Sequence, residues 1–293
     1  MIKKNTSKLL QLSFDIDGID PDIILEWLDL TLHIQAVMIK KPGQKTQAQI
    51  YLQDRQMVDQ IKQQLFKLSS HLFSNFSEQY IPEQNWDKRW KKGLKKIIIS
   101  KKLIISPRWI HHQKSTKKPV VTIDPGMAFG TGYHPTTHMC LEWIVAHSGE
   151  WTQICDIGCG SGILAIGALK CGAKYATALD KDLDAISAAK HNSQLNGFSG
   201  RINILHCSVK SIKVEQPFDC VFANLTAHVV RQQWYHISPL VRPGQGMLII
   251  AGIHQTQLAW FDAWLRRKTR WTILGTNNDT EWSGYLLKRS KAT

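Results

Sequence analysis

The feature that most constrains this chain is a glycine-rich turn between two apolar segments. The turn is Asp156-Ile-Gly-Cys-Gly-Ser-Gly162. Residues Trp151–Cys155 before it predict a buried strand, and Ile163–Lys170 after it predict a helix. Glycine lets the backbone turn sharply and approach a ligand closely, and the first N–H groups of the helix then face that ligand. The order of strand, glycine turn and helix therefore predicts a ligand-binding unit of an α/β fold.

An acid follows the next predicted strand. Tyr175–Leu179 predicts a short strand, and Asp180 stands at its end. A carboxylate in this place of a parallel α/β sheet can accept hydrogen bonds from both ribose hydroxyls of an adenosine. The chain is therefore expected to bind a cofactor that contains adenosine.

The spacing of the glycines separates two such cofactors. Nicotinamide dinucleotides prefer G-x-G-x-x-G, whose last glycine packs the helix against the strand. Here the glycines are Gly158, Gly160 and Gly162, and Ile163 occupies the last glycine position of the dinucleotide pattern. The pattern D-x-G-x-G-x-G instead resembles motif I of the S-adenosylmethionine-dependent methyltransferases. The alternatives are a glycine turn without this role and, more distantly, a nicotinamide oxidoreductase.

Length and composition limit the class of protein. A chain of 293 residues has room for one large and one small domain. No apolar run reaches the roughly 18 residues of a membrane helix, and Gln11, Ser13 and Asp15 interrupt the run that a secretory signal would need. The six cysteines all fall in the predicted cofactor domain without paired C-x-x-C spacing, which indicates buried thiols in a reducing cytosol. We therefore expect a cytoplasmic protein without a membrane segment.

The net charge of +14 at pH 7 is the unusual global property of the chain. An excess of lysine and arginine favours association with nucleic acid, the ribosome or another anionic surface. The alternative is a surface of solvated lysines without such a partner, and the sequence leaves both open.

Residues 1–83 predict a small ferredoxin-like α+β domain. Lys8–Asp15 alternates like a strand, and Ile34–Ile39 and Ala48–Leu52 flank a hairpin turn at Lys41-Pro-Gly-Gln. Pro21–Leu32 and Gln56–Leu68 have helical periodicity, and Phe73–Ile81 completes the plan as a final strand. The order βαββαβ is that of the split βαβ plan. Because this region contains no catalytic constellation, we expect it to recognise the substrate or to be purely structural.

Residues 84–119 predict a linker helix and a connecting segment. Trp86, Trp90 and Leu94 recur every four residues, which gives the helix an apolar stripe. Lysine and arginine are frequent in this segment, and Asp87 is its only acid. A nucleic-acid platform is the alternative to a linker whose tryptophans pack between domains.

Residues 120–293 predict the cofactor domain, in which a loop precedes the glycine turn. Asp124-Pro-Gly-Met-Ala-Phe-Gly-Thr-Gly132 is followed by His134-Pro-Thr-Thr137 at the start of an apolar helix. These residues resemble the signature of the ribosomal protein L11 methyltransferases, the PrmA family. Further matches to the family are Trp86-Asp-x-x-Trp90-Lys, Pro107-x-Trp109, Asp156 to Ile166 and Gly252-Ile253. The resemblance covers about residues 85–290, and the amino-terminal part agrees in plan rather than in residues.

The resemblance implies a fold and an activity. The implied fold is α/β: a Rossmann-like class I methyltransferase domain, preceded by a ferredoxin-like substrate-recognition domain and a linker helix. The implied reaction is methylation of lysine side chains and the terminal α-amine of ribosomal protein L11, free or on the large subunit, with S-adenosyl-L-methionine as cofactor. We expect neither a metal nor DNA as a partner, and contact with RNA stays open.

The positions that match the family's motifs give the expected site. The implied cofactor contacts are Thr137, Gly158, Gly160, Asp180 and Asn224, with Phe129 and Thr131 covering the cofactor. The loop precedes the strand whose carboxyl end holds the ligand, so it can fold over the cleft. The spacing of His134 and His138 would also suit a metal pair, but no acidic third ligand is evident.

One further polar residue ends a predicted strand. Phe218–Asn224 is apolar until its last residue, and in this superfamily that place faces the transferring methyl. The carbonyl of Asn224 can accept a hydrogen bond from the incoming amine, and an asparagine that only caps a turn is the alternative. Amino-methylases of bases carry N-P-P-Y there, so the Asn-Leu-Thr-Ala of this chain argues against base methylation. It also departs from the family's Asn-Ile-Leu-Ala.

The rest of the chain predicts the end of this fold. The expected elements are a helix to Val241 that includes Trp234, a strand at Met247–Ile250, a helix at Gln255–Arg267, and an antiparallel pair at Trp271–Leu274 and Tyr285–Leu287.

Three departures leave the substrate open: the basic charge, Tyr133 in the Gly-Thr-Gly-Tyr-His loop, and the divergent first domain. The family's substrate is itself basic, so a chain of charge +14 gains no electrostatic steering toward it. The first alternative is therefore the same chemistry on another protein lysine or on RNA. The second is a non-catalytic RNA- or ribosome-binding module, against which the intact glycine motif and Asp180 argue.

Overall fold

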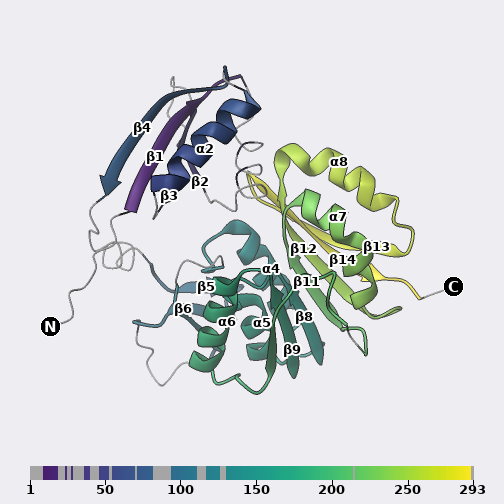
Figure 1. Ribbon diagram of the computed structural model, residues 1–293. Helices are drawn as coiled ribbons and strands as arrows, with labels where there is room; N and C mark the ends of the chain where they lie inside the picture. The colour runs from purple at the N-terminus through teal and green to yellow at the C-terminus, as the bar shows by residue number, and fades with distance from the viewer. Residues whose placement is uncertain are drawn as a thin grey trace. The chain divides into compact units, whose positions relative to one another are not determined.

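The computed structural model divides into two compact units, residues 1–93 and 94–293. The structure describes residues 9–18, 24, 28, 36–39, 46–52, 55–69, 71–81, 94–110, 117–125, 130–213 and 215–291. The first unit contains a four-stranded sheet, and the second contains a seven-stranded and a three-stranded sheet (Figure 1).

The first unit is an antiparallel sheet with helix α2 along it (Figure 1). Its strands are β1 (Leu9–Ile16), β2 (Ala36–Ile39), β3 (Thr46–Leu52) and β4 (Phe73–Ile81), in the order β2-β3-β1-β4. Helix α2 (Arg55–Leu68) buries Val58, Ile61 and Leu65, which share one face because they recur every three or four residues. The strand order is that of the predicted ferredoxin-like plan.

The first predicted helix of this unit falls mostly outside the described residues. Within its predicted range Pro21–Leu32, Ile24 and Leu28 are helical and fully buried. They join one apolar cluster with the inward side chains of the sheet, such as Leu12 and Phe14.

The second unit is built on a seven-stranded sheet in the order β10-β9-β8-β11-β12-β14-β13. The strands are β8 (Gln153–Ile157), β9 (Tyr175–Asp180), β10 (Ile202–His206), β11 (Cys220–Asn224), β12 (Met247–His254), β13 (Trp271–Asn278) and β14 (Trp282–Arg289). The helices are α4 (Pro135–Ala146), α5 (Ile163–Lys170), α6 (Leu183–Leu195), α7 (Ala227–Ile237) and α8 (Gln255–Arg266).

The topology of this sheet is that of the predicted Rossmann-like fold. Strands β10, β9, β8, β11 and β12 are parallel, and β14 runs antiparallel between β12 and β13. The chain moves outward from β8 through β9 to β10, then returns to the other side of β8 at β11. In such sheets ligands bind at the carboxyl ends of the strands beside this reversal.

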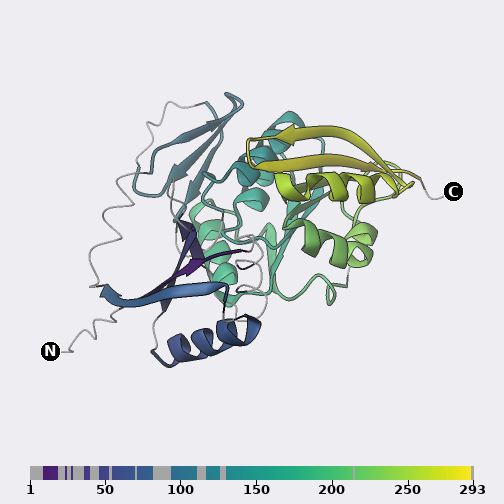
Figure 2. The same cartoon turned by 90° about the horizontal axis from the view of Figure 1, so that it is seen from above.

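Alternating side chains fill two apolar clusters, one on each face of the sheet. Along β11, Cys220 and Phe222 join the cluster that contains residues of α4 and α5, whereas Val221 and Ala223 join the cluster that contains residues of α7 and α8. The near-continuous apolar strands follow from this burial on both faces. Figures 1 and 2 show α7 and α8 next to each other, beside the part of the sheet that ends in β14 and β13.

A second, small sheet contains residues that the sequence assigned to the connecting segment 84–119. Strands β5 (Ile97–Ile99), β6 (Leu103–Pro107) and β7 (Val120–Ile123) are joined in that order and pack against α4, α5 and α6 (Figure 2). Ile99, Leu103 and Ile105 are buried, which explains why this part of the segment is ordered sheet rather than a connection. The linker helix predicted from Trp86 to Leu94 lies almost entirely outside the described residues.

The structure corrects the bounds of several predicted elements, among them the strands β11, β12, β13 and β14, of which β11 begins later and the other three are longer than predicted. The helix expected to reach Val241 ends at Ile237 and is followed by a short 3₁₀ turn, because Pro239 lacks the N–H that would continue it. Strand β8 lies two residues later than predicted and includes Asp156. Among the described residues, no helix is both long and apolar enough to cross a membrane.

Candidate active site

The predicted glycine turn has a backbone conformation that favours glycine. Gly158, Gly160 and Gly162 have φ angles of 69°, 51° and 77°. A side chain in this left-handed region is strained by contact between its Cβ atom and the backbone. Gly162 is the N-cap of α5, which begins at Ile163 as predicted. The turn thus brings β8 directly into the amino end of a buried helix.

The predicted ribose acid holds this turn in place. The N–H of Gly160 donates to Asp180 Oδ2 at 2.9 Å, and the N–H of Asp182 donates to Oδ1 at 3.1 Å. The N–H of Gly158 donates to the carbonyl of Leu179 at 2.8 Å. A carboxylate has about four lone-pair sites, so Asp180 keeps acceptor capacity for two hydroxyl groups.

The predicted catalytic residue lies one strand further along the same edge. Asn224 ends β11, which pairs with β8, while Asp180 ends β9 on the other side of β8. The side chain of Asn224 is half-buried, and its amide forms no hydrogen bond with any residue that the structure describes. Asp180, the glycine turn and Asn224 are therefore arranged in a row along the carboxyl edge of the parallel strands.

Neighbouring residues leave no room for a side chain at Gly158 or Gly162. A Cβ atom on Gly158 would lie 2.7 Å from Leu225 Cδ2, directly after Asn224. A Cβ atom on Gly162 would lie 3.2 Å from the Cβ of Ala189 on α6. The turn is thus packed between the end of β11 and helix α6.

Helix α4 brings the predicted Thr137 to the same edge. The ring of His134, the N-cap of α4, lies 5.1 Å from the ring of Trp282, and His254 at the end of β12 lies 5.3 Å from the same ring. The hydroxyl of Thr137 is fully buried and has no hydrogen-bond partner among the described residues. A buried unpaired hydroxyl is costly, so this group fits a site completed by a polar ligand.

The two ends of the predicted covering loop are also anchored to the turn. The hydroxyl of Ser161 donates to the carbonyl of Gly130, and Gly132 packs between Ile105 and Ile163. Thr131, half-buried between these glycines, is held close to the start of α5. Phe129, the other predicted covering residue, lies outside the described residues.

These features fit an adenosine-containing cofactor. The glycine turn offers backbone without side chains, Asp180 offers acceptors for ribose, and Thr137 offers an unpaired hydroxyl.

A comparison with known families decides which family the site belongs to. The family model PrmA, described as Ribosomal protein L11 methyltransferase, matches residues 29–290. The chain belongs to the PrmA family.

Individual relatives agree with this membership. A Ribosomal protein L11 methyltransferase from Haemophilus influenzae (strain PittEE) is 38% identical over 195 residues, which are 66% of this chain and 65% of the relative. One from Desulforamulus reducens is 33% identical over 228 residues, 77% of this chain and 72% of the relative. The aligned part thus spans slightly less than two thirds of the Haemophilus protein.

A solved structure supports the fold as well. The crystal structure of a ribosomal protein L11 methylase from Lactobacillus delbrueckii subsp. bulgaricus superimposes with a TM-score of 0.56 at 29% identity. The superposition covers 67% of this chain and 98% of the other.

The tyrosine that departs from the PrmA loop pattern has a structural role. The hydroxyl of Tyr133 donates to the carbonyl of Lys95, just before β5. This bond ties the end of the loop to the small sheet. Partial burial also raises the pKa of Tyr133, so the phenol stays a hydrogen-bond donor at neutral pH.

The two histidines considered as a metal pair have other partners. The Nδ1 atom of His134 lies 2.8 Å from the hydroxyl of Thr136 and accepts from its N–H, so it caps α4. His138 pairs with Glu142 one turn later at 3.5 Å. Burial lowers the pKa of His134, which favours the neutral ring that can accept these bonds. Within the described ranges, no three His, Cys, Asp or Glu side chains gather as a metal site would require.

The cysteines behave as the sequence indicated. Five of the six are buried, Cys207 is half-buried, and all are free thiols. Burial raises the pKa of Cys140, Cys155 and Cys220 well above the usual range of a thiol, so they stay protonated and apolar.

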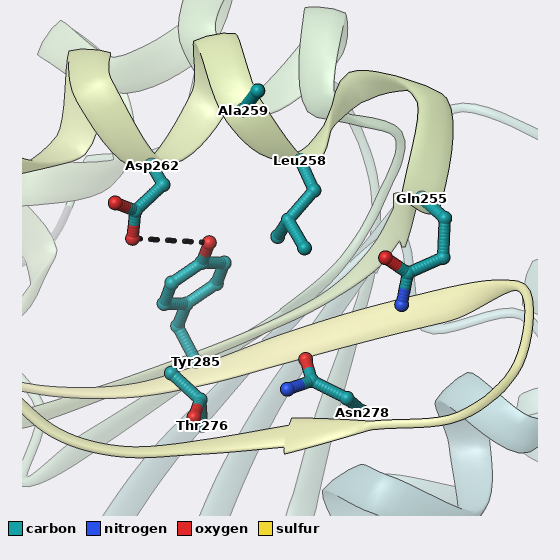
Figure 3. Close-up of a pocket in the computed structure, with 7 residues that line it drawn as sticks. All are labelled: Gln255, Leu258, Ala259, Asp262, Thr276, Asn278 and Tyr285. Atoms are coloured by element: carbon teal, nitrogen blue, oxygen red, sulfur yellow. Dashed lines mark hydrogen bonds between the residues drawn. The ribbon is translucent and has the colours of Figure 1, made fainter.

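A separate cavity of about 420 Å³ lies between α8 and the β13–β14 pair. Figure 3 shows the hydroxyl of Tyr285 pointing to Asp262, with Leu258, Gln255 and Asn278 around the opening. Asp262 is already paired with Arg266 at 2.6 Å. None of the predicted site residues lines this cavity, so we assign it no part in the active site.

Sequence reasoning missed several residues that shape this site. Leu225 and Asn192 contact the glycine turn, and Ser161 within it binds Gly130, but their types alone do not indicate these roles. The sequence does contain one signal for Asn192. It and Asn196, the C-cap of α6, are polar residues one helical turn apart on the inner side of the helix.

Replacing Gly252 tests how tightly the end of β11 is held. Gly252 has a φ of 89°, and a Cβ atom on it would lie 2.7 Å from the backbone oxygen of Leu225. We expect Gly252→Ala to lower the free energy of unfolding by about 3 kcal/mol, since left-handed strain and a backbone clash add. Urea unfolding measures this loss.

The control for this substitution is Gly149→Ala. Gly149 has a φ of 85°, but nothing lies within 4 Å of its Cβ position. Gly149→Ala should therefore lower the free energy of unfolding by about 1 kcal/mol, the cost of the backbone strain alone. Equal losses of unfolding free energy in Gly252→Ala and Gly149→Ala would contradict the role assigned to the contact with Leu225.

Proposed function

We propose that this protein transfers methyl groups from S-adenosylmethionine to amines of ribosomal protein L11. The observation that carries the proposal is the row formed by Asp180, the glycine turn and Asn224 at one edge of the sheet, where the amide of Asn224 has no hydrogen-bond partner among the described residues. Membership of the PrmA family supports the same substrate. We further infer that the acceptors are lysine side chains and the terminal α-amine, and that the reaction takes place in the cytoplasm.

The chain's own residues would bind and orient the cofactor. Asp180 would accept from the ribose hydroxyls, Gly158 and Gly160 would let the backbone approach, and Thr137 would pair its buried hydroxyl. Phe129 and Thr131 would cover the cofactor. When bound, S-adenosylmethionine supplies a methyl group that its sulfonium already activates. Positioning therefore contributes more than acid–base chemistry.

The acceptor must arrive as a neutral amine with its lone pair free. For a lysine of pKa about 10.4, deprotonation at pH 7 costs about 4–5 kcal/mol. Burial beside the apolar side chain of Leu225 lowers this cost because it disfavours the ammonium form. Asn224 would then accept one N–H of the amine through its carbonyl and aim the lone pair. We assign no general base.

Calorimetry and methyl transfer test this function. Titration with S-adenosylmethionine and with S-adenosylhomocysteine is expected to give saturable binding. Labelled methyl groups should then appear in purified ribosomal protein L11. Transfer to another protein or to RNA in a cell extract, with none to L11, would replace the substrate but keep the chemistry. Absence of heat with both ligands would overturn the proposal.

Asn224→Ala tests the orientation of the amine. We expect kcat to fall roughly tenfold, as the loss of one hydrogen bond of about 1.5 kcal/mol in the transition state requires. Cofactor affinity should change much less than kcat. Single-turnover methyl transfer measures the difference.

The matched control is Asn203→Ala on the edge strand β10, where the side chain is exposed. It should leave kcat unchanged. An unchanged kcat in Asn224→Ala as well would remove Asn224 from the mechanism.

A further inference from the structure

Helix α6 connects the ribose acid with the loop that precedes α4. Its N-cap, Asp182, donates its N–H to Asp180 Oδ1 at 3.1 Å. Its other end carries the buried Asn192 and the half-buried Asn196, which face β7 and the glycine turn. One helix therefore touches the cofactor edge of the sheet at one end and the loop at the other.

The side chain of Asn192 joins two segments that are far apart in sequence. Its Nδ2 atom donates to the carbonyl of Ser161 at 2.9 Å, and its Oδ1 atom accepts from the N–H of Asp124 at 2.8 Å. Asn192 is 0% exposed, so neither bond is exchanged with water. A primary amide has the donor and the acceptor that these two partners require, which neither a carboxylate nor an apolar group has.

Ser161 extends this connection to the far end of the loop. Its hydroxyl donates to the carbonyl of Gly130, while its carbonyl accepts from Asn192. The carboxylate of Asp124 is held from outside by Arg108 and by His191, each at 3.1 Å. Both ends of the segment 124–130 are thus attached to the glycine turn, one through Asn192 and the other through Ser161.

We propose that Asn192 is a positioning residue, which sets the loop before α4 against the glycine turn so that both meet the cofactor in one arrangement. This inference rests on the proposed function. Asn192 does not touch the reacting atoms; it acts through Asp124 and Ser161. Its removal detaches Asp124 from the glycine turn, while the bond between Ser161 and Gly130 remains.

Asn196 provides a matched control on the same helix. Its amide donates to the carbonyl of Thr122 at 2.6 Å and accepts from the N–H of Thr122 at 2.9 Å. It therefore anchors β7 to α6 with two hydrogen bonds, as Asn192 anchors the loop, but it has no bond to the glycine turn. A purely structural role would make the two asparagines equivalent.

The experiment compares Asn192→Leu, Asn192→Asp and Asn196→Leu in the full chain. We expect all three to lower the melting temperature. Only the two Asn192 variants should weaken S-adenosylhomocysteine binding by calorimetry, by about tenfold for the lost pair of buried hydrogen bonds. Without ligand, hydrogen exchange should increase at the N–H of Asp124 and across 158–162 in Asn192→Leu, and at the N–H of Thr122 in Asn196→Leu.

Ser161→Ala keeps the test decisive if the Asn192 variants fold poorly. It removes only the bond to Gly130, so it should lower the melting temperature by only a few degrees, weaken ligand binding relative to the wild type and increase hydrogen exchange at 130–132. Equal ligand affinity in the Asn192 and Asn196 variants would overturn the positioning role. Failure of the wild-type chain to bind S-adenosylhomocysteine would instead overturn the proposed function, whatever hydrogen exchange reports about the anchor.

Discussion

Asp180→Asn is expected to weaken S-adenosylmethionine binding about a hundredfold or more, because each ribose hydroxyl would lose a charge-assisted hydrogen bond worth roughly 1.5–3 kcal/mol. Asparagine has one acceptor oxygen, which the N–H of Gly160 would occupy. Its NH₂ group would then face the N–H of Asp182 as a second donor and could no longer accept from a ribose hydroxyl. Isothermal titration calorimetry with both S-adenosylmethionine and its thioether product measures the loss.

The control removes one carboxylate charge from the same neighbourhood. Asp184 is exposed in the first turn of α6 and has the same charge as Asp180. Asp184→Asn should change ligand affinity less than about fivefold, since an exposed charge at a helix terminus contributes only about 0.3–1 kcal/mol. A similar loss in both variants would mean that general electrostatics, rather than ribose binding, explains the effect of Asp180.

Asp156 is expected to make the stability of the protein depend on pH. The pKa of this carboxyl is raised from 3.8 to about 7, mainly by burial, with the N–H of Ala165 opposing the shift and the nearby Asp180 adding to it. Between pH 3.8 and about pH 7, the folded protein therefore binds more protons than the unfolded chain. The stabilising effect of the protonated form is complete below about pH 4 and is lost as the pH rises through about 7.

Comparison with Asp156→Asn isolates this effect. The amide resembles the protonated acid, so the two proteins should have similar stability near pH 4. Above pH 7 the variant should be more stable by about 4 kcal/mol, the value of a shift of about three pH units at 1.36 kcal/mol each. Urea unfolding at pH 4.5, 6 and 8 measures the difference.

Asp184→Asn, a substitution at an exposed position, again serves as the control. The difference between its free energy of unfolding and that of the wild type should not vary in this way with pH. A difference between Asp156→Asn and the wild type that stays constant from pH 4.5 to 8 would contradict the buried, neutral carboxyl.

Much of the fold was predictable because it is encoded locally. Helix α5 begins and ends at the predicted residues, and strand β4 does as well. Helix α5 is an apolar run that starts after Gly162 and ends before Gly172, and strand β4 ends directly before Pro82. The strand order of the first unit followed from the order of its elements, since the split βαβ plan permits few arrangements.

Other parts of the structure depend on packing that no local pattern contains. Strands β5 and β6 come from the segment that the sequence assigned to a connection between domains. Their side chains Ile99 and Leu103 become buried only when they pack against α4 and its neighbours. The glycine turn was predictable, whereas its contacts with Leu225 and Ala189 were not. These contacts join residues that are separated by more than 25 positions in the chain.

The sequence by itself determined the strand–turn–helix unit, the acid after the next strand and the polar residue that ends β11. Each of them follows from the types of neighbouring residues. Only the tertiary structure decided that Asp180 and Asn224 stand on either side of one turn, and that Asn192 bonds to Asp124 across 68 positions. It also decided that the hydroxyl of Thr137 is buried with no partner in the described part of the chain. The physical reason is that hydrogen bonds and close packing act through space, whereas periodicity records only which face of its own element a residue occupies.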